Sequence, residues 1–381
     1  MKAKGLCLEM SKFSFRKYVP GDDDEINRLY FEVTGRQRTA EQYRWQWHEA
    51  PGGTGEIWLI EAEEKSGEAK IIGHHGIMPI RFSSGALNLL AGKTENTMVH
   101  PAYRPKILYP KYERHFLSEY ENKFDLLFST TGPSAALRLR RALGYKADKR
   151  WNHYAWALNP GALTSIFASG FSHKSNSHLA IGAVKLANIG TSFLRLLKFR
   201  TGSSLKTLPL ACLSSSDAMC HPFFACFWGS VRKEYVLTPT RDREDLAWRF
   251  WKNPYATYVT LICEGHHEGD AYAIVRDCGN SVFTLDDIVC SPPTKHFLLK
   301  VLESVCVWVD EHGGNVLKFS STSDAFLPSQ SFSEFKFENI YESFPLNRVR
   351  KNKDQFMLRR ITNSLCAQEE WFVTPIVFEG R

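Results

Sequence analysis

The segment VHPAYRPKILYPKYERHF (residues 99–116) joins a strand to a helix and is the most informative stretch for the fold. An extended run ends at His100-Pro101, Arg104 follows, and an amphipathic helix begins near Pro110. A strand, a loop and a helix N-terminus in this order can hold a phosphate group. Such loops are usually rich in glycine, whereas this one reads Pro105-Lys106-Ile107-Leu108-Tyr109. The segment therefore indicates a cofactor loop, a degenerate cofactor loop or a plain turn.

The sequence on both sides of this segment predicts an α/β unit. Alternating and buried apolar patterns predict strands, and caps followed by helical spacing predict helices. The expected strands are 13–18, 56–64, 69–85, 87–101, 125–132 and one or two within 145–158; the expected helices are 22–35, 39–50, 110–122 and 133–144. Strands and helices alternate in the second half of this unit, which is typical of α/β proteins.

An internal repeat extends this prediction to the rest of the chain. Residues 41–61 align without gaps on residues 244–264, and in both an aromatic helix stops at proline before a strand. The coinciding residues are Glu41/Glu244, Trp45/Trp248, Pro51/Pro254, Thr54/Thr257 and Glu61/Glu264. We therefore expect two mixed-sheet α/β domains, at 12–158 and 236–362, joined by a helical or irregular connector at 159–235 and followed by a tail at 363–381. An amphipathic helix at 178–199 would pack on a domain or lie on a membrane surface.

The composition narrows the class of protein. A formal net charge of +7 over 381 residues suits an anionic ligand such as a nucleotide or CoA and is too weak to indicate DNA binding. Nine cysteines without a C-x-x-C pair predict reduced thiols in a cytoplasmic protein and no metal site. The N-terminus does not read as a signal peptide, and no apolar run is long enough for a transmembrane helix.

Four stretches resemble the GNAT superfamily of N-acetyltransferases in a tandem arrangement. They are RKYVPGDDDEINRLY (16–30), IIGHHGIMPIRF (71–82), AGKTENTMVHPAYR (91–104) and RRALGY (140–145). The resemblance covers residues 12–158 well and residues 236–325 more weakly. It implies acetyl-CoA or another acyl-CoA as donor, and the amine of a small molecule, an amino sugar or a peptide as acceptor.

The resemblance also implies where the donor binds. The pantetheine arm would lie along the backbone of Thr97, Met98 and Val99, and the pyrophosphate on the loop that begins at Arg104. That loop contains Lys106, Ile107, Leu108 and Tyr109 and has lost both small residues of the family pattern. Proline at 105 removes an N–H donor, and a β-branched residue resists positive φ. We expect a weakened or reshaped anion site.

Four residues are candidates for the chemistry. The family's general-acid tyrosine falls on Arg140, which would stabilise a thiolate but donate protons poorly. Glu95, on the fourth strand, matches the family's carboxylate base; alternatively it is a solvated strand residue. His74 and His75 point to opposite faces of their strand, so one would meet the substrate, while a structural role is the alternative.

The leading prediction is an acyltransferase in which the amine attacks the thioester directly. The second copy lacks the loop, and we expect it to be structural and to wall the acceptor pocket. One alternative is a Fem-like enzyme that takes its acyl group from aminoacyl-tRNA or an acyl carrier protein, which the basic run Arg138–Arg141 would meet. The other is a non-catalytic scaffold.

Overall fold

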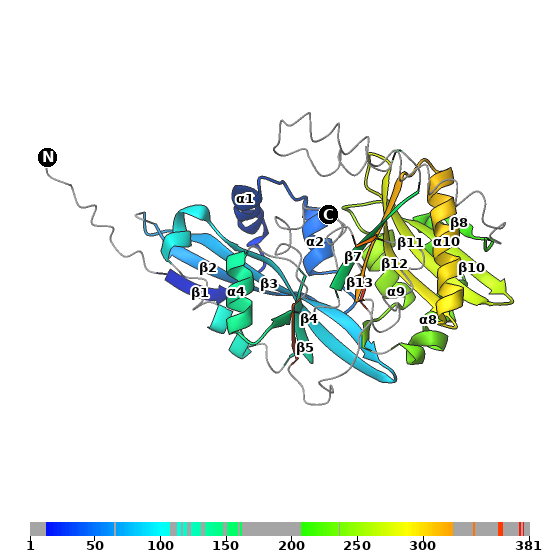
Figure 1. Cartoon of the computed structure of the whole chain (residues 1–381). Helices are drawn as coiled ribbons and strands as arrows, with labels where there is room; N and C mark the ends of the chain where they lie inside the picture. Colours follow the sequence, from blue (N-terminus) through cyan, green and yellow to red (C-terminus); the bar gives the residue numbers. More distant parts are fainter. Residues whose placement is uncertain are drawn as a thin grey trace.

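The computed structural model shows two bodies of sheet and helix that lie side by side (Figure 1). It describes residues 13–64, 66–106, 113–115, 117–119, 123–130, 134–147, 151–158, 161, 207–235, 237–322, 338–339, 357–360, 373–374 and 376. The helix predicted at 178–199 and most of the predicted tail lie outside these residues. Within the described ranges, no helix is both long and apolar enough to cross a bilayer.

The first sheet has the strand order β1-β2-β3-β4-β5-β15-β6, and β9 pairs with β3. Neighbours are antiparallel, except that β4 and β5 run parallel. The strands are β1 (Phe13–Lys17), β2 (Glu56–Glu63), β3 (Ala69–Ser84), β4 (Leu87–Val99), β5 (Leu126–Ser129), β15 (Met357–Arg360), β6 (Lys146–Ala147) and β9 (Thr238–Pro239).

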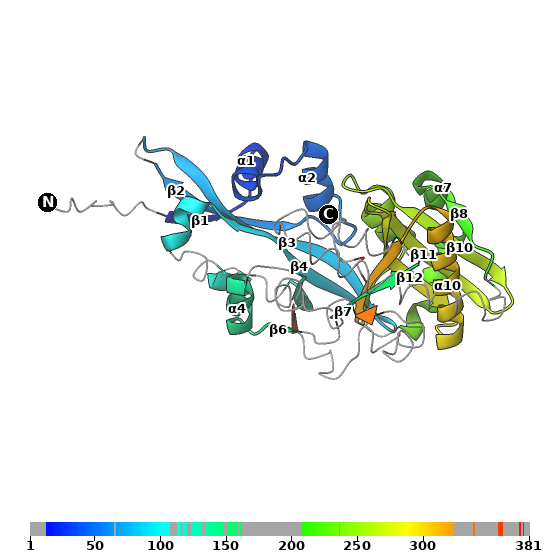
Figure 2. The ribbon, with the colours of Figure 1, turned by 45° about the horizontal axis from the view of Figure 1, so that its top comes forward.

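Helices cover both faces of the first sheet. Helices α1 (Asp23–Thr34) and α2 (Ala40–Trp47) lie on one face and α4 (Ser134–Ala142) on the other (Figure 2). The start of α2 follows from a capping box, in which Thr39 and Gln42 bond each other's backbone N–H groups. The end of α1 follows from Gly35, whose φ of 71° is left-handed. These local signals are why the sequence predicts both helices.

The second sheet has the order β8-β10-β11-β12-β13-β7-β14, again with one parallel pair, β12 and β13. Helix α10 (Lys295–Glu311) packs on one face, and α8 (Phe223–Val231) packs near Tyr272 on the other. The strands are β8 (Ala211–Leu213), β10 (Val259–His266), β11 (Gly269–Asp277), β12 (Val282–Ser291), β13 (Val316–Thr322), β7 (Trp151–Ala157) and β14 (Glu338–Asn339). The remaining helices are α7 (Ser215–Cys220), η2 (Arg232–Glu234), α9 (Arg243–Leu246) and the π-helical turn η3 (Ala247–Trp251).

The two sheets match position by position, except that they exchange a strand. The sixth position of the first sheet is held by β15, from the C-terminal part of the chain. The sixth position of the second sheet is held by β7, from the N-terminal part. From the sequence we expect β7 to close the first unit; this expectation is wrong, because β7 pairs with β13 in the second sheet. A strand's alternation encodes its two faces but not its partner, which is why the sequence does not reveal the exchange.

The two copies of the repeat also touch. The indole rings of Trp45 and Trp248 stack with centroids 5.2 Å apart. Each indole N–H donates to the other tryptophan's backbone carbonyl, at 2.7 and 2.9 Å. Repeat-equivalent residues that contact each other reciprocally lie on a local two-fold axis. One apolar core, which contains both tryptophans, therefore continues from the first unit into the second.

Part of the predicted connector belongs to the second unit. Residues 207–235 form β8, α7, α8 and η2, and β8 pairs with β10 as an edge strand. The sequence places this stretch in the helical or irregular connector because β8 is only three residues long and mostly exposed. Such a short edge strand carries no alternation that a pattern could detect.

Candidate functional site

The first sheet divides between β4 and β5, and we call this place the first fork. The strands pair from Ala91 opposite Leu126 to Lys93 opposite Phe128. The Thr94 hydroxyl then donates to the Phe128 carbonyl at 3.4 Å. Beyond this point, among the described residues, β4 continues to Val99 beside β3 alone. The fork therefore leaves one edge of residues 94–99 without a partner among the strands that the structure describes.

A β-bulge lies on the β4 side of the first fork. Gly76 is opposite Glu95, and His74 is opposite Met98. Between these two pairs β3 advances by two residues and β4 by three, so β4 carries one extra residue. Asn96 within the bulge has a φ of 47°, which is unusual for a residue other than glycine. The bulge changes which backbone groups of β4 point towards the fork.

Val99 presents its backbone to the fork. The next residue, His100, donates its N–H to the Ile72 carbonyl on the β3 side at 2.8 Å. Because successive residues of a strand point to opposite edges, the Val99 N–H and C=O point away from β3. The Val99 carbonyl accepts from Nε of Arg104, an exposed residue, at 3.1 Å. Thr97 and Val99 are half-buried and Met98 is buried.

The loop predicted to bind pyrophosphate begins as a short helix. Pro101–Lys106 forms the 3₁₀-helix η1. The N–H of Tyr103 bonds the His100 carbonyl at 2.9 Å, and that of Ala102 bonds Nδ1 of His100 at 3.3 Å. Prolines 101 and 105 have no N–H. Over 101–106 the only other N–H groups are those of Arg104 and Lys106; Ile107, Leu108 and Tyr109 lie outside the described residues.

His74 and His75 lie on opposite faces of β3, as the alternation predicts. His74 is buried beside α2, with its ring 5.4 Å from that of Trp47. Burial lowers the pKa of His74 to about 3, so the ring is neutral near neutral pH. Its Nδ1 lies 2.8 Å from the backbone carbonyl of Asn96.

His75 is buried on the other face, beneath the helical residues 113–115. Its Nδ1 lies 3.0 Å from the hydroxyl of Thr97 and 3.4 Å from Oε2 of the buried Glu113. Burial lowers the pKa of His75 and outweighs the opposing effect of the Glu113 carboxylate. His75 thus connects β3 with the bulged strand β4.

Glu95 and Arg140 meet the first fork from different faces. Glu95 lies 2.6 Å from Nζ of Lys93, whose side chain is 1% exposed. Both are on the α2 face, because a Cβ at Gly76, opposite Glu95, would come within 2.0 Å of Trp47. Arg140 is buried on the α4 face and donates to the hydroxyl of Ser129 at the end of β5. The fork therefore carries a cation on each face.

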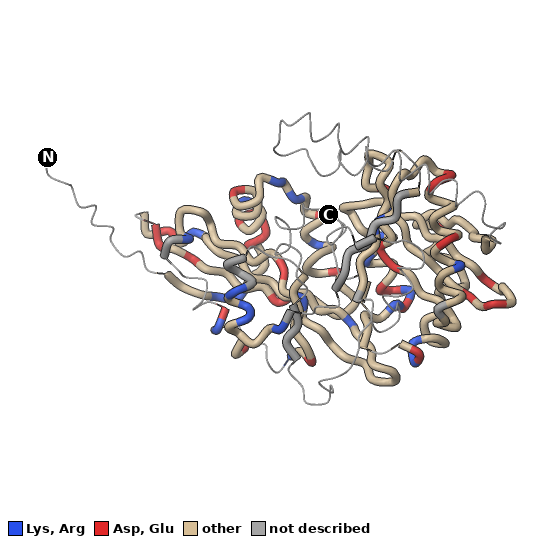
Figure 3. The backbone as a smooth tube through the Cα atoms, in the orientation of Figure 1, with Lys and Arg blue, Asp and Glu red and all other residues tan. Residues whose placement is uncertain are grey.

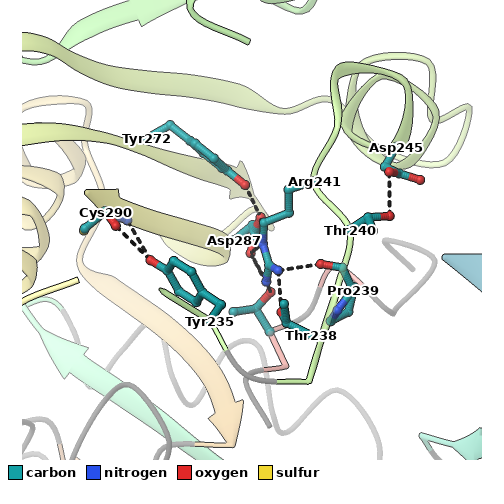
Figure 4. A network of polar contacts seen from close by, with 10 residues as sticks. Tyr235, Thr238, Pro239, Thr240, Arg241, Asp245, Tyr272, Asp287 and Cys290 are labelled. Carbon is teal, nitrogen blue, oxygen red and sulfur yellow. Dashed lines mark hydrogen bonds and ion pairs between the residues drawn. The ribbon is translucent and has the colours of Figure 1, made fainter. Parts of the chain in front are cut away.

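The second sheet has an equivalent fork, but the chain itself fills it. The pair β12–β13 ends at Leu285 opposite Phe319, and β12 continues to Ser291. The hydroxyl of Tyr235 donates to the Cys290 carbonyl at 2.9 Å and accepts from the Cys290 N–H at 3.1 Å (Figure 4). Burial raises the pKa of Tyr235 well above its ordinary value, so this hydroxyl keeps its proton.

A buried ion pair completes this second fork. Arg241 and Asp287 are both fully buried, and Nε of the arginine lies 3.0 Å from the carboxylate (Figure 4). The same carboxylate accepts from Tyr272 at 2.7 Å and from Thr374 at 2.6 Å. Every oxygen of Asp287 is therefore bonded within the protein, and the cluster is structural.

A small cavity lies between the two units. Its lining includes Arg81 of β3 and Thr240, Asp245 and Trp248 of the second unit. Asp245 accepts from Arg81 at 2.9 Å and from Thr240 at 2.7 Å. Burial nevertheless raises the pKa of Asp245 to about 6. The cavity lies along β3 beyond the closed end of the first fork, where Arg81 is opposite Leu90 of β4.

No metal site accompanies these residues. Across the parts of the chain that the structure describes, no group of three or more His, Cys, Asp and Glu side chains could hold a metal ion.

Comparison with solved structures identifies the fold. A conserved protein of Enterococcus faecalis, described as a probable N-acyltransferase, matches with a TM-score of 0.56 and 11% identity over 92% of this chain and 73% of that one. A GCN5-related N-acetyltransferase of Anabaena variabilis matches with a TM-score of 0.53 and 12% identity over 92% and 73%. An N-myristoyltransferase of Saccharomyces cerevisiae with bound myristoyl-CoA matches with a TM-score of 0.51 and 12% identity over 94% and 84%. No protein-family model and no curated protein matches the chain.

The chain thus has the GCN5-related N-acetyltransferase fold, a mixed α/β architecture. The resemblance predicted from the sequence is confirmed at the level of the fold. Two residues at the first fork were not foreseen, Lys93 and Glu113. Lys93 stands in an apolar strand two residues before Glu95, which was a detectable signal; Glu113 reads as an ordinary helix residue.

Proposed function

We propose that this protein transfers a short acyl group from acyl-CoA to an amine at the first fork. The observation that carries the proposal is the edge of β4, where Val99 presents its N–H and C=O beyond the last pairing with β5. An amide of a pantetheine arm can bond such an edge as a neighbouring strand would. The fold supports this use, because solved structures that share it include acyltransferases.

The donor would lie between the two cationic surfaces of the fork. Thr97, Met98 and Val99 would bond the pantetheine, and Arg104 with residues 106–109 would face the pyrophosphate. Exposed arginines 138 and 141 on α4 add positive charge on the neighbouring helix (Figure 3). Positive charge around the site would attract the phosphates of CoA.

The chemistry would use groups from both faces. The acceptor amine would attack the thioester carbonyl on the α2 face, where Glu95 would take its proton directly or through water. The ion pair with Lys93, at 2.6 Å, would hold the Glu95 carboxylate in place. Arg140 would stabilise the departing thiolate from the α4 face. The acceptor, a small molecule, an amino sugar or a peptide amine, would approach Glu95 on the α2 face from the open end of the fork.

The closed end of the fork favours a short acyl group such as acetyl. A single carbon added at Gly92 would come within 2.6 Å of Leu127, and one at Gly76 within 2.0 Å of Trp47. Both faces of the sheet are therefore filled beside the closed end. A long chain would also have to lie against the Lys93–Glu95 ion pair, which is unfavourable for an apolar group.

A titration with acetyl-CoA, followed by calorimetry and thermal unfolding, tests the proposal. We expect saturable binding that Arg104→Glu weakens by at least about tenfold, since it reverses a charge facing phosphate. Lys233→Glu, an equal charge change on the exposed surface of the second unit, should leave binding unchanged. Absence of binding to any acyl-CoA would reject the proposal, and equal weakening by both variants would reject the placement at Arg104.

One observation favours a second candidate, a donor carried on an acyl carrier protein. In η1, two prolines lack N–H groups and two further N–H groups bond His100, which leaves few donors for a pyrophosphate. A carrier-bound phosphopantetheine has the same arm but no pyrophosphate. Transfer or binding with an acetylated carrier protein, together with no response to acetyl-CoA, would favour this candidate.

A further inference from the structure

The bulge on β4 is held by a side chain of the neighbouring strand. Nδ1 of His74 lies 2.8 Å from the Asn96 backbone carbonyl. A carbonyl oxygen can only accept, so the hydrogen must be on Nδ1 of the imidazole. The residue that it fixes has a φ of 47°, a conformation that persists only when its surroundings enforce it.

The surroundings keep this bond in place. His74 is 0% exposed and stands edge-on to Trp47, which is itself fully buried. The charged and titratable groups that influence its pKa are Arg38 and Glu95, and His75 from the opposite face of β3. Burial outweighs them and lowers the pKa of His74, so the ring stays neutral with its single hydrogen on Nδ1.

The hydrogen bond between His74 and Asn96 affects the first fork because of its place along β4. His74 is opposite Met98, so the extra residue of β4 falls between Glu95 and Met98. Shifting a strand by one residue exchanges the edges to which its backbone groups point. The bulge therefore determines that Val99 bonds towards the fork while Glu95 stays on the α2 face.

We propose that His74 is a positioning residue, which clamps the Asn96 bulge and thereby directs the backbone of β4 towards the donor. The effect on donor affinity rests on the proposed function, whereas the effect on the bulge does not. Nε2 of His74, buried and without a hydrogen-bond partner among the described residues, is not needed for this role.

Two substitutions distinguish the role of Nδ1 from that of Nε2 in the His74 ring. In His74→Asn the side-chain amide nitrogen can take the place of Nδ1, whereas in His74→Gln it reaches the place of Nε2. We expect His74→Gln to speed hydrogen exchange at the Thr97 and Met98 amides, and to weaken acetyl-CoA binding, by about tenfold each. His74→Asn should stay within about threefold of the wild type. The pair His312→Asn and His312→Gln is the matched control: this exposed histidine of the second unit also has its Nδ1 at 2.7 Å from a backbone carbonyl, that of Trp308, and both variants should leave the exchange and the binding unchanged.

Equal rates of amide hydrogen exchange in the two His74 variants, or a slower rate in His74→Gln than in His74→Asn, would overturn the proposal. Nitrogen-15 NMR of the wild-type imidazole is independent of whether the variants fold. A hydrogen on Nδ1 supports the clamp, and a hydrogen on Nε2 alone overturns it. If the wild type binds no acyl-CoA, the proposed function fails, while the exchange and NMR results still decide the role of His74.

Discussion

The two forks have the same topology and opposite interiors. In the first, the outward carbonyl of Val99 accepts, among the residues that the structure describes, a bond from an exposed arginine alone; in the second, both backbone groups of Cys290 are bonded by the buried Tyr235. Each residue stands two places before a proline, at the end of the equivalent strand. The comparison shows that the strands create the fork, and that side chains reaching it from elsewhere decide whether it can take a ligand.

The charged groups differ in the same way. The second fork pairs Asp287 with Arg241 and satisfies both oxygens with further donors. The first fork leaves Glu95 partly exposed beside Lys93. A fully bonded buried network makes a fork rigid and structural, whereas a partly exposed carboxylate can exchange protons with a substrate.

The largest expected effect comes from opening the second fork. Asp287→Ala leaves the Arg241 guanidinium buried without its carboxylate and should cost about 3–5 kcal/mol of unfolding free energy. Urea denaturation measures it, and Glu264→Ala on the surface of the same unit should cost under about 0.5 kcal/mol. A loss no larger than that of the control would contradict a structural role for this cluster.

Acid should affect the first fork through His74. Its pKa is lowered to about 3 in the folded protein, against an ordinary value of 6.5. The stability that a neutral His74 contributes is present above pH 6.5 and is lost as the pH falls towards 3. At pH 5 the loss should reach about 2 kcal/mol. Denaturation of the wild type and His74→Asn between pH 7 and pH 5 measures the difference; parallel curves would show that His74 does not titrate in this way.

The smallest expected effect comes from the hydroxyl of Tyr235. Tyr235→Phe removes the partner of the Cys290 N–H and C=O and should cost roughly 1–2 kcal/mol. Tyr18→Phe, whose hydroxyl bonds Asp23 near the surface, is the control and should cost less. Acetyl-CoA should bind with a stoichiometry of one in the wild type and in Tyr235→Phe. Binding of two acetyl-CoA molecules per wild-type chain would contradict the conclusion that only the first fork can take a ligand.

The part of the fold that could be predicted from the sequence depends on local signals. The strand at 87–99, the cap at Thr39 and the repeat of Trp45 in Trp248 all depend on near neighbours in the sequence. Alternation likewise places His74 and His75 on opposite faces. The exchange of β7 and β15 could not be predicted, because each strand finds its partner far along the chain.

The same contrast between local signals and long-range contacts applies to the residues of the candidate site. Sequence reasoning reaches Glu95, Arg104 and Arg140 through a family pattern, and their roles remain predictions. It does not reach Glu113 or Tyr235, because neither has a local pattern, and each acquires its place through contacts across tens of residues.

By itself, the sequence determined two similar α/β units and the strand–loop–helix order around Arg104, because periodicity, caps and prolines act within a few residues. Only the tertiary structure decided that the units exchange a strand, that a buried histidine holds the Asn96 bulge, and that Tyr235 fills one of two equivalent forks. These features depend on hydrogen bonds and burial between distant segments, which exist only once the chain has folded.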